Sequence, residues 1–437
     1  MPQLRRSRSV CYQCRVKMTA TISILTLGCK VNQCDGQELA QALQARGYCL
    51  ADGRPADLYI INTCTVTQMA DAKARKLIRR TIRQNPGCPV IVTGCYAQVS
   101  GSQLGSISGV AAVVSNSDKD RIAEIASSLL PPDSSPARQP VAVPPRGQRV
   151  RAFLKVQDGC EHGCTYCIVP RARGPQRSNP LEQVVDELRR LAAAGAQEVV
   201  LAGIRLGAYG RDLPRGSLAD LLACSRQIPL PRLRLSSLEP MDVTPELIRA
   251  LASHPSLCPH LHLPLQSGDD AILAAMGRGY TAAQFRQLPA QLRQVWPDVA
   301  LTTDVMVGFP GETEQAFANT CRLVEEAGFA QLHIFCFSPR PGTTAAQLPG
   351  QVPEPVKQER SRRLFALARR LFSREAAKWV GREVRVLFER RDAEGRWQGR
   401  TEQYFPVRIK SEADLRGQIR TLRVDGLGTD SLTGAVS

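Results

Sequence analysis

Long apolar runs, acidic residues and lysine are scarce in this 437-residue sequence. No stretch approaches the roughly 18 consecutive apolar residues of a membrane-spanning helix, so we expect no membrane segment. The basic residues before Met18 lack the apolar core of a secretory signal peptide, which argues against secretion. Met18 is an alternative start, because an apolar strand is predicted directly after it.

The shortage of acidic residues gives the chain a strong positive charge. Lys and Arg total 57 against 40 Asp and Glu, so the net charge is +17 and the predicted pI is 9.5. Such an excess predicts a polyanionic partner, with nucleic acid first. Only nine of the basic residues are lysine. A GC-rich genome would favour arginine over lysine, but it would not produce an excess of bases over acids.

Cysteine, by contrast, is abundant. Fifteen cysteines without a secretion signal predict metal or redox chemistry in a reducing cytoplasm, and they argue against a disulfide framework. A cytoplasmic location is therefore expected.

Three of these cysteines, Cys160, Cys164 and Cys167, form a C-x3-C-x2-C loop. A cubic iron–sulfur cluster bound by only three thiolates keeps one iron open for another ligand, so the loop predicts a reactive cluster. The alternative is a structural zinc knuckle, for which His162 is the nearest fourth candidate. Structural zinc sites prefer four ligands in paired C-x2-C form, so the spacing favours the open cluster.

The length predicts two to three domains. We expect a basic, disordered extension at 1–19, in which Cys11 and Cys14 have the spacing of a metal-binding pair. The other expected segments are an α/β domain at 20–130, a Pro-rich linker at 131–149, a second α/β domain at 150–375 and an all-β domain at 376–437.

In the first domain, short apolar strands at 22–28, 57–64, 90–96 and 110–115 alternate with helical patterns, which predicts a small parallel sheet. Three further cysteines each follow one of these strands. Because the carboxyl ends of parallel strands meet in one crevice, we expect a second three-cysteine metal site there. The alternative is that they are buried apolar residues. The three cysteines are Cys29, Cys64 and Cys95.

The second α/β domain repeats a strand–helix unit six times, which predicts a complete or partial TIM-like (β/α)6 barrel with its chemistry at the carboxyl ends of the strands. The three-cysteine loop lies directly after the first strand. Several later strands end in polar and Gly-rich segments, which we interpret as a pocket for a polar cofactor. The predicted strands span 151–159, 198–204, 232–237, 260–265, 300–309 and 331–338.

The end of the chain predicts a basic amphipathic helix at 357–378 and then a small five-stranded OB-like barrel, a shape often used to bind RNA. Basic residues also gather at 73–83. We expect these runs to contact phosphates, although a solvated helix face is the usual alternative. Further basic residues assigned to this surface are Arg171, Arg173, Arg177, Arg362 and Arg363.

With these residues laid out, the chain resembles the radical S-adenosylmethionine (SAM) methylthiotransferases from Ile22 to Gly434. The three-cysteine loop followed by Ile168-Val169-Pro170 is similar to the cluster loop of that family, and residues 399–408 resemble its TRAM domain. The matches to the ligands of the auxiliary cluster of the family are Cys29, Cys64 and Cys95.

Two segments, GCKVN at 28–32 and NTCTVT at 62–67, are most similar to the branch that acts on threonylcarbamoyladenosine in tRNA. The isopentenyladenosine branch typically has Gln-Met-Asn after the first cysteine, and the branch that modifies a ribosomal-protein aspartate has Pro-Lys-Asn. Cys34 and Asp35 stand where that tRNA branch usually has Tyr-Glu, and Arg171 stands where Tyr is common. These departures weaken the assignment to that branch but not the assignment to the family.

The resemblance implies two 4Fe-4S clusters, SAM as cofactor and tRNA as partner, with an electron donor such as flavodoxin or ferredoxin. The expected reaction places a methylthio group on carbon 2 of N6-threonylcarbamoyladenosine at position 37 of tRNA. The two other branches remain alternatives, and a non-catalytic zinc-bearing RNA-binding protein is a rival of a different class. The residues expected to contact SAM are Tyr166, Gly203, Glu239, Gln266 and Asp304.

Overall fold

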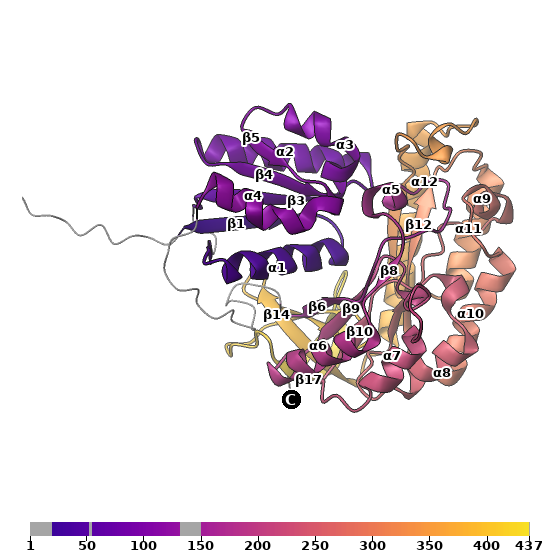
Figure 1. Ribbon diagram of the computed structural model, residues 1–437. Helices are drawn as coiled ribbons and strands as arrows, with labels where there is room; N and C mark the ends of the chain where they lie inside the picture. Colours follow the sequence, from indigo (N-terminus) through magenta and orange to yellow (C-terminus); the bar gives the residue numbers. More distant parts are fainter. Residues whose placement is uncertain (1–19, 52–54, 132–149, 437) are drawn as a thin grey trace, which may run out of the picture.

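The structure is a computed structural model that describes residues 20–51, 55–131 and 150–436. The basic extension with Cys11 and Cys14 and nearly all of the Pro-rich linker lie outside these residues. Figure 1 shows an N-terminal α/β unit beside an arc of strands covered by helices, with a small β-barrel below. Within the described residues, no helix combines the length and apolar character needed to cross a membrane.

The N-terminal unit is a five-stranded parallel sheet in the order β2-β1-β3-β4-β5, with helices on both faces (Figure 1). Successive residues of β3 face opposite layers: Ile60 packs with α1 and α4, and Ile61 with α2 and α3. The strands are β1 (Thr21–Thr26), β2 (Cys49–Leu50), β3 (Leu58–Thr63), β4 (Val90–Gly94) and β5 (Val110–Val113). The helices are α1 (Lys30–Ala45), α2 (Gln68–Gln84), α3 (Cys95–Gly105), a 3-10 turn η1 (Asn116–Arg121) and α4 (Ile122–Leu129).

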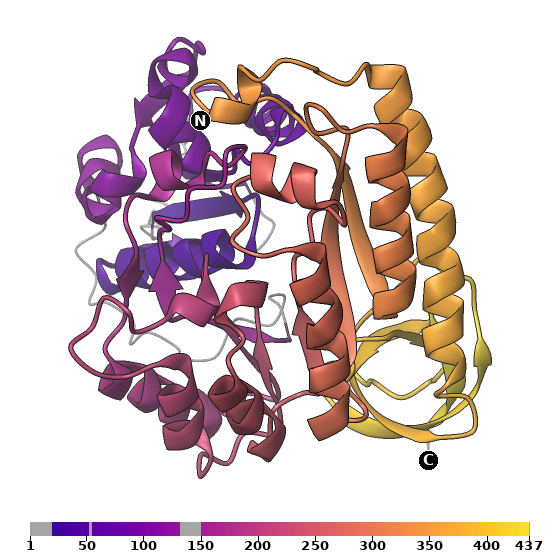
Figure 2. The same cartoon turned by 90° about the vertical axis from the view of Figure 1, so that its right-hand side faces the viewer.

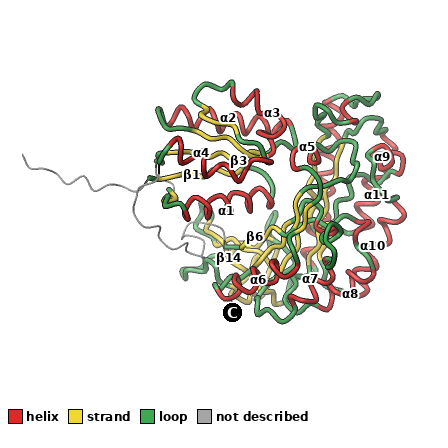
Figure 3. Tube along the Cα trace, viewed as in Figure 1, coloured by secondary structure: helices red, strands yellow, loops and turns green. Residues whose placement is uncertain are grey.

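Six parallel strands form the central domain. They fall into two groups, β10-β9-β6 and β11-β12-β13, which single bridges such as Ser237–His262 join into one arc. Figure 3 shows the helices on the outside of these strands. The sequence-based prediction of a partial (β/α)6 barrel is therefore confirmed. The strands are β6 (Ala152–Lys155), β9 (Val199–Ala202), β10 (Leu233–Leu235), β11 (His260–His262), β12 (Ala300–Val307) and β13 (Gln331–Cys336).

The helices of this domain bury their apolar faces against the strands in the largest core of the chain. They are α6 (Leu181–Ala193), α7 (Leu218–Ser225), α8 (Pro245–Ser253), α9 (Asp270–Ala275), α10 (Ala282–Val295), α11 (Glu314–Ala327) and α12 (Glu354–Ala377). Shorter elements near the strand ends are β7 (Gln157–Asp158), α5 (Val169–Arg173), β8 (Arg177–Ser178), η2 (Leu206–Ala208), η3 (Pro240–Asp242) and η4 (Thr344–Ala346).

The C-terminal strands close into a five-stranded barrel in the order β14-β15-β16-β18-β17, as predicted. Figure 2 shows this barrel beside the end of α12. It is fastened to the central domain by Arg232, whose guanidinium donates to the carbonyl oxygens of Arg385 (2.6 Å) and Arg400 (3.1 Å). The strands are β14 (Glu383–Arg391), β15 (Trp397–Thr401), β16 (Pro406–Ile409), β17 (Ile419–Leu427) and β18 (Leu432–Val436).

Helix α1 of the N-terminal unit packs onto the inner side of the central arc. Val31 and Cys34 of α1 form one apolar cluster with Phe153 of β6 and with Val200 and Ala202 of β9. The beginning of α1 therefore lies at the open side of the partial barrel. This contact brings the cysteines of the N-terminal sheet close to the three-cysteine loop.

Candidate iron–sulfur sites and the cavity between them

The three-cysteine loop runs from β7 to α5 and is held by backbone contacts. Gly159 has φ +71°, and a Cβ at this position would lie 1.9 Å from the carbonyl oxygen of Pro175, so only glycine fits. Cys160 N donates to the Gly174 carbonyl at 3.2 Å, and Thr165 Oγ1 donates to the Ala275 carbonyl at 2.8 Å. The loop is thereby fixed at the carboxyl end of the first barrel strand.

Each thiol of this loop receives an N–H donor. His162 N lies 3.4 Å from Cys160 Sγ, Val169 N lies 3.4 Å from Cys167 Sγ, and Arg278 Nη1 lies 3.2 Å from Cys164 Sγ. Burial, together with the neighbouring thiols and against the Val169 N–H, raises the pKa of Cys167 to about 12. Three crowded, partly buried thiolates with donors directed at sulfur fit a multiply charged metal cluster.

The imidazole of His162 is partly buried, and its Nε2 has no hydrogen-bond partner among the described residues. The charged groups that act on it are Arg205, Arg278 and Asp242; burial and the two arginines lower its pKa. A neutral imidazole is the form that ligates zinc, so these contacts leave the zinc knuckle weighed from the sequence as the alternative.

Arg278 is a residue that sequence reasoning missed. Besides Cys164, its guanidinium contacts the hydroxyl of Tyr166 at 3.4 Å and forms an ion pair with Glu239. It follows α9 as an isolated arginine, far along the chain from the cysteine loop, and no local pattern distinguishes it.

The second set of cysteines lies at the ends of three neighbouring strands. Cys29 follows β1, Cys64 follows β3 and Cys95 follows β4, and these strands are adjacent in the sheet. The segments that carry Cys29 and Cys64 lie close together, because a Cβ at Gly28 would lie 2.7 Å from the Cβ of Cys64. Burial, with smaller contributions from the thiols of Cys95 and Cys29, raises the pKa of Cys64 to about 11. The three sulfur atoms thus share one electrostatic environment, which also fits a metal cluster.

Arg173 joins this second set to the three-cysteine loop. It forms ion pairs with Asp35 of α1 (3.0 Å) and with Asp158 of β7 (2.8 Å), and it hydrogen-bonds Asn32. Asn32 Oδ1 lies in turn 3.6 Å from Cys95 Sγ. The expectation that Arg173 contacts phosphate is therefore wrong, because its side chain is buried and paired.

Cys34 does not join the second set. It is buried in the apolar cluster between α1 and the barrel strands, and burial raises the pKa of its thiol to about 12. A neutral, packed thiol explains its place better than ligation.

A cavity of about 400 Å³ lies between the three-cysteine loop and the residues that follow Cys64. Val66 and Thr67, which follow Cys64, form one wall, and the cluster loop forms another. The lining is mostly apolar. Val66 at its edge is 52% exposed and nearby Met69 is 67% exposed, an arrangement suited to a flat, partly apolar ligand. The lining from the loop is Tyr166, Cys167, Ile168 and Val169, and from β12, β13 and beyond it is Asp304, Met306, Phe335, Cys336, Phe337 and Ser338.

The walls of this cavity are held together across the domain boundary. Arg340, after β13, donates to Thr65 Oγ1 at 2.7 Å and pairs with Asp71 at 2.6 Å. Gln68 at the start of α2 donates through its backbone N–H to Ser338 Oγ at 3.2 Å. These contacts hold the loop after Cys64 against the end of β13.

The residues expected to contact SAM occupy different positions. Gly203, Glu239 and Gln266 lie just beyond β9, β10 and β11, on the same rim as the cluster loop. Gln266 has φ +64°, and its buried Oε1 has no hydrogen-bond partner among the described residues, so it can accept from a ligand. Tyr166 lies within the cluster loop itself.

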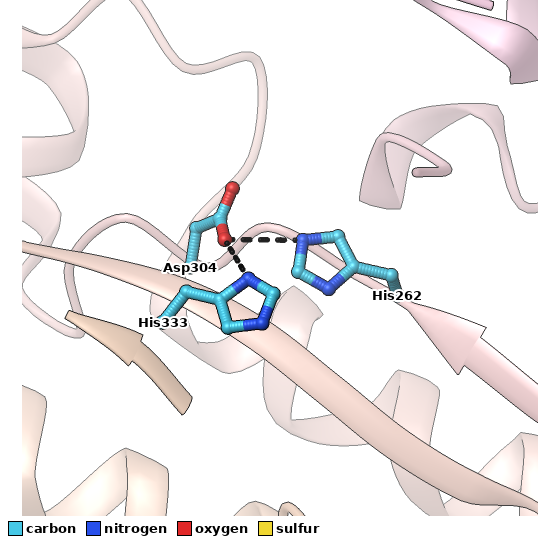
Figure 4. Close-up of side chains that lie close together, drawn as sticks. All are labelled: His262, Asp304 and His333. Carbon is cyan, nitrogen blue, oxygen red and sulfur yellow. Dashed lines mark hydrogen bonds and ion pairs between the residues drawn. The ribbon is translucent and has the colours of Figure 1, made fainter. Parts of the chain in front are cut away.

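Asp304 lies within β12, below that rim. His262 Nε2 and His333 Nδ1 both contact Asp304 Oδ1 at 3.2 Å, as Figure 4 shows. Burial raises the pKa of Asp304, but the hydrogen bonds from the two imidazoles outweigh it and hold the pKa well below its usual range. Asp304 is therefore an anion inside the barrel.

The basic surface differs from helix to helix. On α2, Lys76, Arg79 and Arg80 are exposed, and none forms an ion pair within the described residues. On α12, Arg362 pairs with Glu359 and Arg363 pairs with Glu314. The named cations of α2 are therefore unpaired among the described residues, whereas Arg362 and Arg363 on α12 have acidic partners; phosphate contact by these runs stays a prediction.

Sequence comparisons place these features in known families. Residues 154–324 match the radical SAM superfamily, residues 21–115 match the uncharacterized protein family UPF0004, and residues 377–436 match the TRAM domain. The fold of the chain is similar to that of the radical SAM methyltransferase TsrM from Kitasatospora setae, with a TM-score of 0.56 at 16% identity. That alignment covers 75% of this chain and 77% of TsrM.

Relatives at higher identity span nearly the whole chain. The threonylcarbamoyladenosine tRNA methylthiotransferase MtaB of Bacillus subtilis is 38% identical, covering 93% of this chain and 94% of the relative. The MtaB of Thermotoga maritima is also 38% identical, covering 94% and 96%. A tRNA-2-methylthio-N(6)-dimethylallyladenosine synthase of Methylacidiphilum infernorum is 36% identical, covering 92% of each chain. With this extent of similarity, the chain belongs to the radical SAM methylthiotransferase family.

Proposed function

We propose that this protein transfers a methylthio group to carbon 2 of N6-threonylcarbamoyladenosine at position 37 of tRNA. The observation that carries the proposal is the cavity of about 400 Å³ whose walls come from both cysteine loops. A base held there lies between a radical source and a sulfur source. The similarity to the threonylcarbamoyladenosine tRNA methylthiotransferases of B. subtilis and T. maritima supports this substrate.

The cofactors of the family are SAM and two 4Fe-4S clusters. We assign the first cluster to Cys160, Cys164 and Cys167 and the second to the set that follows the N-terminal strands. When bound, the first cluster and SAM supply a radical able to remove hydrogen from an aromatic carbon, and the second cluster supplies the sulfur. The residues of the second set are Cys29, Cys64 and Cys95.

The chain itself contributes positioning and exclusion of water. The ion pair of Arg340 with Asp71 holds the loop after Cys64 against β13, which keeps the two cysteine sets at a constant separation. Met306, Phe335 and Phe337 make the cavity apolar, which limits the water that can enter it. Gln266 offers an unpaired acceptor, and Glu239 offers a carboxylate beside Arg278, for the polar parts of SAM.

We assign tRNA binding to the unpaired cations of α2 and to the TRAM barrel. Lys76 and Arg79 lie on the helix that begins directly beside the cavity, so phosphates bound there would lead the target base toward it. A flavodoxin or ferredoxin in the cytoplasm is the electron donor that we expect for this chemistry.

A strictly anaerobic reaction of the reconstituted protein with SAM, a reductant and tRNA that contains N6-threonylcarbamoyladenosine tests the proposal. Mass spectrometry of the digested tRNA is expected to show the methylthio derivative of that nucleoside. If the nucleoside stays unmodified while a ribosomal-protein aspartate gains the group, the substrate is wrong. Zinc without iron in the anaerobically purified protein would overturn the enzyme assignment altogether.

The apolar lining of the cavity favours one second candidate, the dimethylallyl derivative of adenosine. Met306, Phe335 and Phe337 would accommodate a neutral prenyl group as readily as the base itself. The same reaction with tRNA that contains dimethylallyladenosine separates the two: preference for that tRNA would move the chain to the branch of the M. infernorum relative.

A further inference from the structure

Two histidines and one aspartate from three adjacent barrel strands form a compact cluster. Asp304 of β12 is the register partner of His333 of β13, and His262 comes from β11 on the other side of β12. The ligand atoms of the three residues all lie within 4.8 Å of one another, and Figure 4 shows both imidazoles directed at the carboxylate. We call these residues the His–Asp–His cluster; it contains no cysteine and belongs to neither cysteine set.

The cluster borders the cavity and is open at one end. Asp304 lines the cavity, as do Met306 and Phe335, which form the register pair two residues further along β12 and β13. Because alternate residues of a strand share a face, His333 lies on the same face of β13 as Phe335. The side chain of His333 is 62% exposed, whereas that of His262 is 9% exposed. A small ion can therefore reach the cluster from the side of His333.

The orientation of His262 is fixed by a hydroxyl group. His262 Nδ1 lies 2.9 Å from Thr302 Oγ1, so the other ring nitrogen, Nε2, faces Asp304 Oδ1 at 3.2 Å. Thr302 Oγ1 is itself held by His260 Nε2 at 3.0 Å. Histidines that bind metals typically have their second ring nitrogen tied in this way, which fixes the direction of the ligating nitrogen. His262 is thus oriented as a ligand would be.

Asp304 has no partner among the basic side chains. Within the described residues its ion-pair contacts are the two imidazoles alone, at 3.2 Å each, and neither a lysine nor an arginine pairs with it. A carboxylate away from water is normally paired with a cation or coordinates a metal. The competing arrangement is an ion pair with one protonated imidazole. One imidazole would suffice for that pair, whereas the convergence of two on one carboxylate oxygen is explained by a shared metal ion.

The positive charge nearest to this region is held by other groups. Next to His260 lies Tyr404, whose ring stacks on the imidazole with centroids 4.7 Å apart. Three arginines surround the Tyr404 ring, and they contact Tyr404 and glutamates, not the His–Asp–His cluster. They are Arg234, which pairs with Glu198 at 2.8 Å, Arg151, which pairs with Glu389 at 2.7 Å, and Arg400, which donates to the Tyr404 carbonyl at 3.1 Å.

The donor atoms of the cluster determine the class of metal. Ca²⁺ and Mg²⁺ take oxygen ligands, so two imidazole nitrogens exclude them as the preferred ions. Cu⁺ prefers thiolates and thioethers, and the cluster has neither. Two imidazoles and one carboxylate are a usual set for Zn²⁺ and Fe²⁺, and three protein ligands leave a position open.

We propose that His262, Asp304 and His333 bind one divalent transition-metal ion, separate from the two iron–sulfur sites. Because Asp304 belongs to both the cluster and the lining of the cavity, the ion lies at the edge of the cavity. Its open position there takes water or an oxygen atom of a bound ligand. The proposal goes beyond the proposed function and does not depend on which nucleoside is the substrate.

Metal analysis of the anaerobically purified, cluster-loaded protein tests the proposal. Zn²⁺ is the probe, because sites of this kind bind it more tightly than Mn²⁺ or Fe²⁺. After dialysis against chelator-buffered zinc, wild type is expected to hold about one zinc together with about eight irons per chain. His333→Gln and Asp304→Asn are expected to lose the zinc and keep the iron. His333 is the main target, because its exposed side chain can be changed without disturbing the core.

Two further variants make the test specific. Asp186→Asn on α6 is the matched control, since it makes the same change at an aspartate whose side chain is 73% exposed, and it is expected to keep the zinc. Thr302→Val keeps the shape of the side chain but removes the hydroxyl that orients His262. It is expected to weaken zinc binding by about 10- to 100-fold, the usual effect of losing such a partner.

X-ray absorption at the zinc edge identifies the ligands directly. The proposal predicts nitrogen and oxygen neighbours at about 2.0–2.1 Å and no sulfur neighbour at about 2.3 Å. Sulfur neighbours would place the zinc at the cysteines and overturn the inference. Absence of zinc from wild type, or an equal zinc content in Asp304→Asn, would overturn it as well. Methylthio transfer is not part of the measurement, so a failed inference leaves the proposed function standing.

Discussion

The two cysteine sets show two ways of building a site for the same kind of cofactor. Cys160, Cys164 and Cys167 lie within eight residues and are held by backbone hydrogen bonds of their own loop. Cys29 and Cys64 belong to different strands and meet Cys95 only because the sheet forms. The first site is organised by local chain geometry, and the second depends on the folding of a whole domain.

Each set is also served by one buried arginine from elsewhere in the chain. Arg278 donates to the sulfur of Cys164, whereas Arg173 acts on the second set through Asn32. Arg173 also joins α1 to β7, so it couples the docking of the two domains to the environment of the cysteines. The comparison predicts that damage to the first set stays local and damage to the second spreads to domain docking.

The largest expected effect comes from removing one thiol from each set. In both Cys164→Ala and Cys64→Ala we expect iron to fall from about eight to about four atoms per chain and methylthio transfer to stop. Cleavage of SAM to deoxyadenosine should be lost in Cys164→Ala alone, because that set produces the radical. Iron assays and chromatography of deoxyadenosine measure both. Cys224→Ala, which changes an exposed cysteine on α7, is the control. Loss of SAM cleavage in Cys64→Ala would contradict the separate roles assigned to the two cysteine sets.

The two arginines provide the next test. Arg173→Met removes the link between Asp35 and Asp158, although Asp35 keeps Lys119 and Lys155 as partners. The stability of domain docking should therefore fall by about 1.5–3 kcal/mol, and Arg173→Lys should recover part of it. Differential scanning calorimetry would show an earlier first transition. Arg278→Met should leave that transition in place and instead alter the spectrum of the first cluster, since Cys164 loses its donor. An equal shift of the transition in both variants would contradict the division of roles.

The comparison extends to the basic helices near each set. The pair Lys76→Gln and Arg79→Gln on α2 should weaken tRNA binding and reduce its salt dependence by nearly two units of the log–log slope, because each removes a phosphate contact. The pair Arg362→Gln and Arg363→Gln on α12 should have a much smaller effect, because acidic partners already neutralise these cations. Filter binding across a series of salt concentrations measures the slope for each double variant. Equal slopes for the two variants would show that exposure of a cation, and not its lack of an acidic partner, determines whether it contacts phosphate.

The smallest effect concerns Tyr404, which lies between β15 and β16 of the C-terminal barrel and accepts a hydrogen bond from Arg151. Burial raises its pKa, but Arg151 and Arg400 outweigh burial and lower the pKa to about 8. A tyrosinate absorbance near 295 nm should therefore appear around pH 8 in the difference between wild type and Tyr404→Phe. Because the folded pKa is below the ordinary value of about 10, wild type gains stability relative to the variant as pH rises from 8 to 10 and loses that gain as pH falls through 8. If no transition appears near pH 8, Arg151 and Arg400 do not lower the pKa of Tyr404 as expected.

Much of the fold followed from pattern alone. The six barrel strands, the strands before Cys29, Cys64 and Cys95 and the closed C-terminal barrel were all predicted, because alternating short apolar strands and helices have few stable arrangements. The two-residue strand β2 was not predicted, since Cys49 and Leu50 form no strand pattern without their partner β1.

The errors concern side chains whose roles depend on distant partners. Arg173 and Arg363 were expected on an RNA surface, but acidic residues remote in sequence neutralise them. Arg362 was expected there too, and it pairs with Glu359 on its own helix. Arg278 was missed for the same reason as Arg173: its partners, Cys164 and Glu239, are far from it along the chain. Charge counted along a sequence does not show which charges pair in space.

The sequence alone determined the chemistry of this protein: the spacing of Cys160, Cys164 and Cys167 and the placement of three more cysteines at strand ends are local properties that survive without coordinates. Only the tertiary structure decided that the three-cysteine loop and the residues after Cys64 line one cavity and that Arg173 is buried between Asp35 and Asp158. The physical reason is that thiol spacing is set by a few backbone torsions, whereas electrostatic pairing is set by distances across three domains.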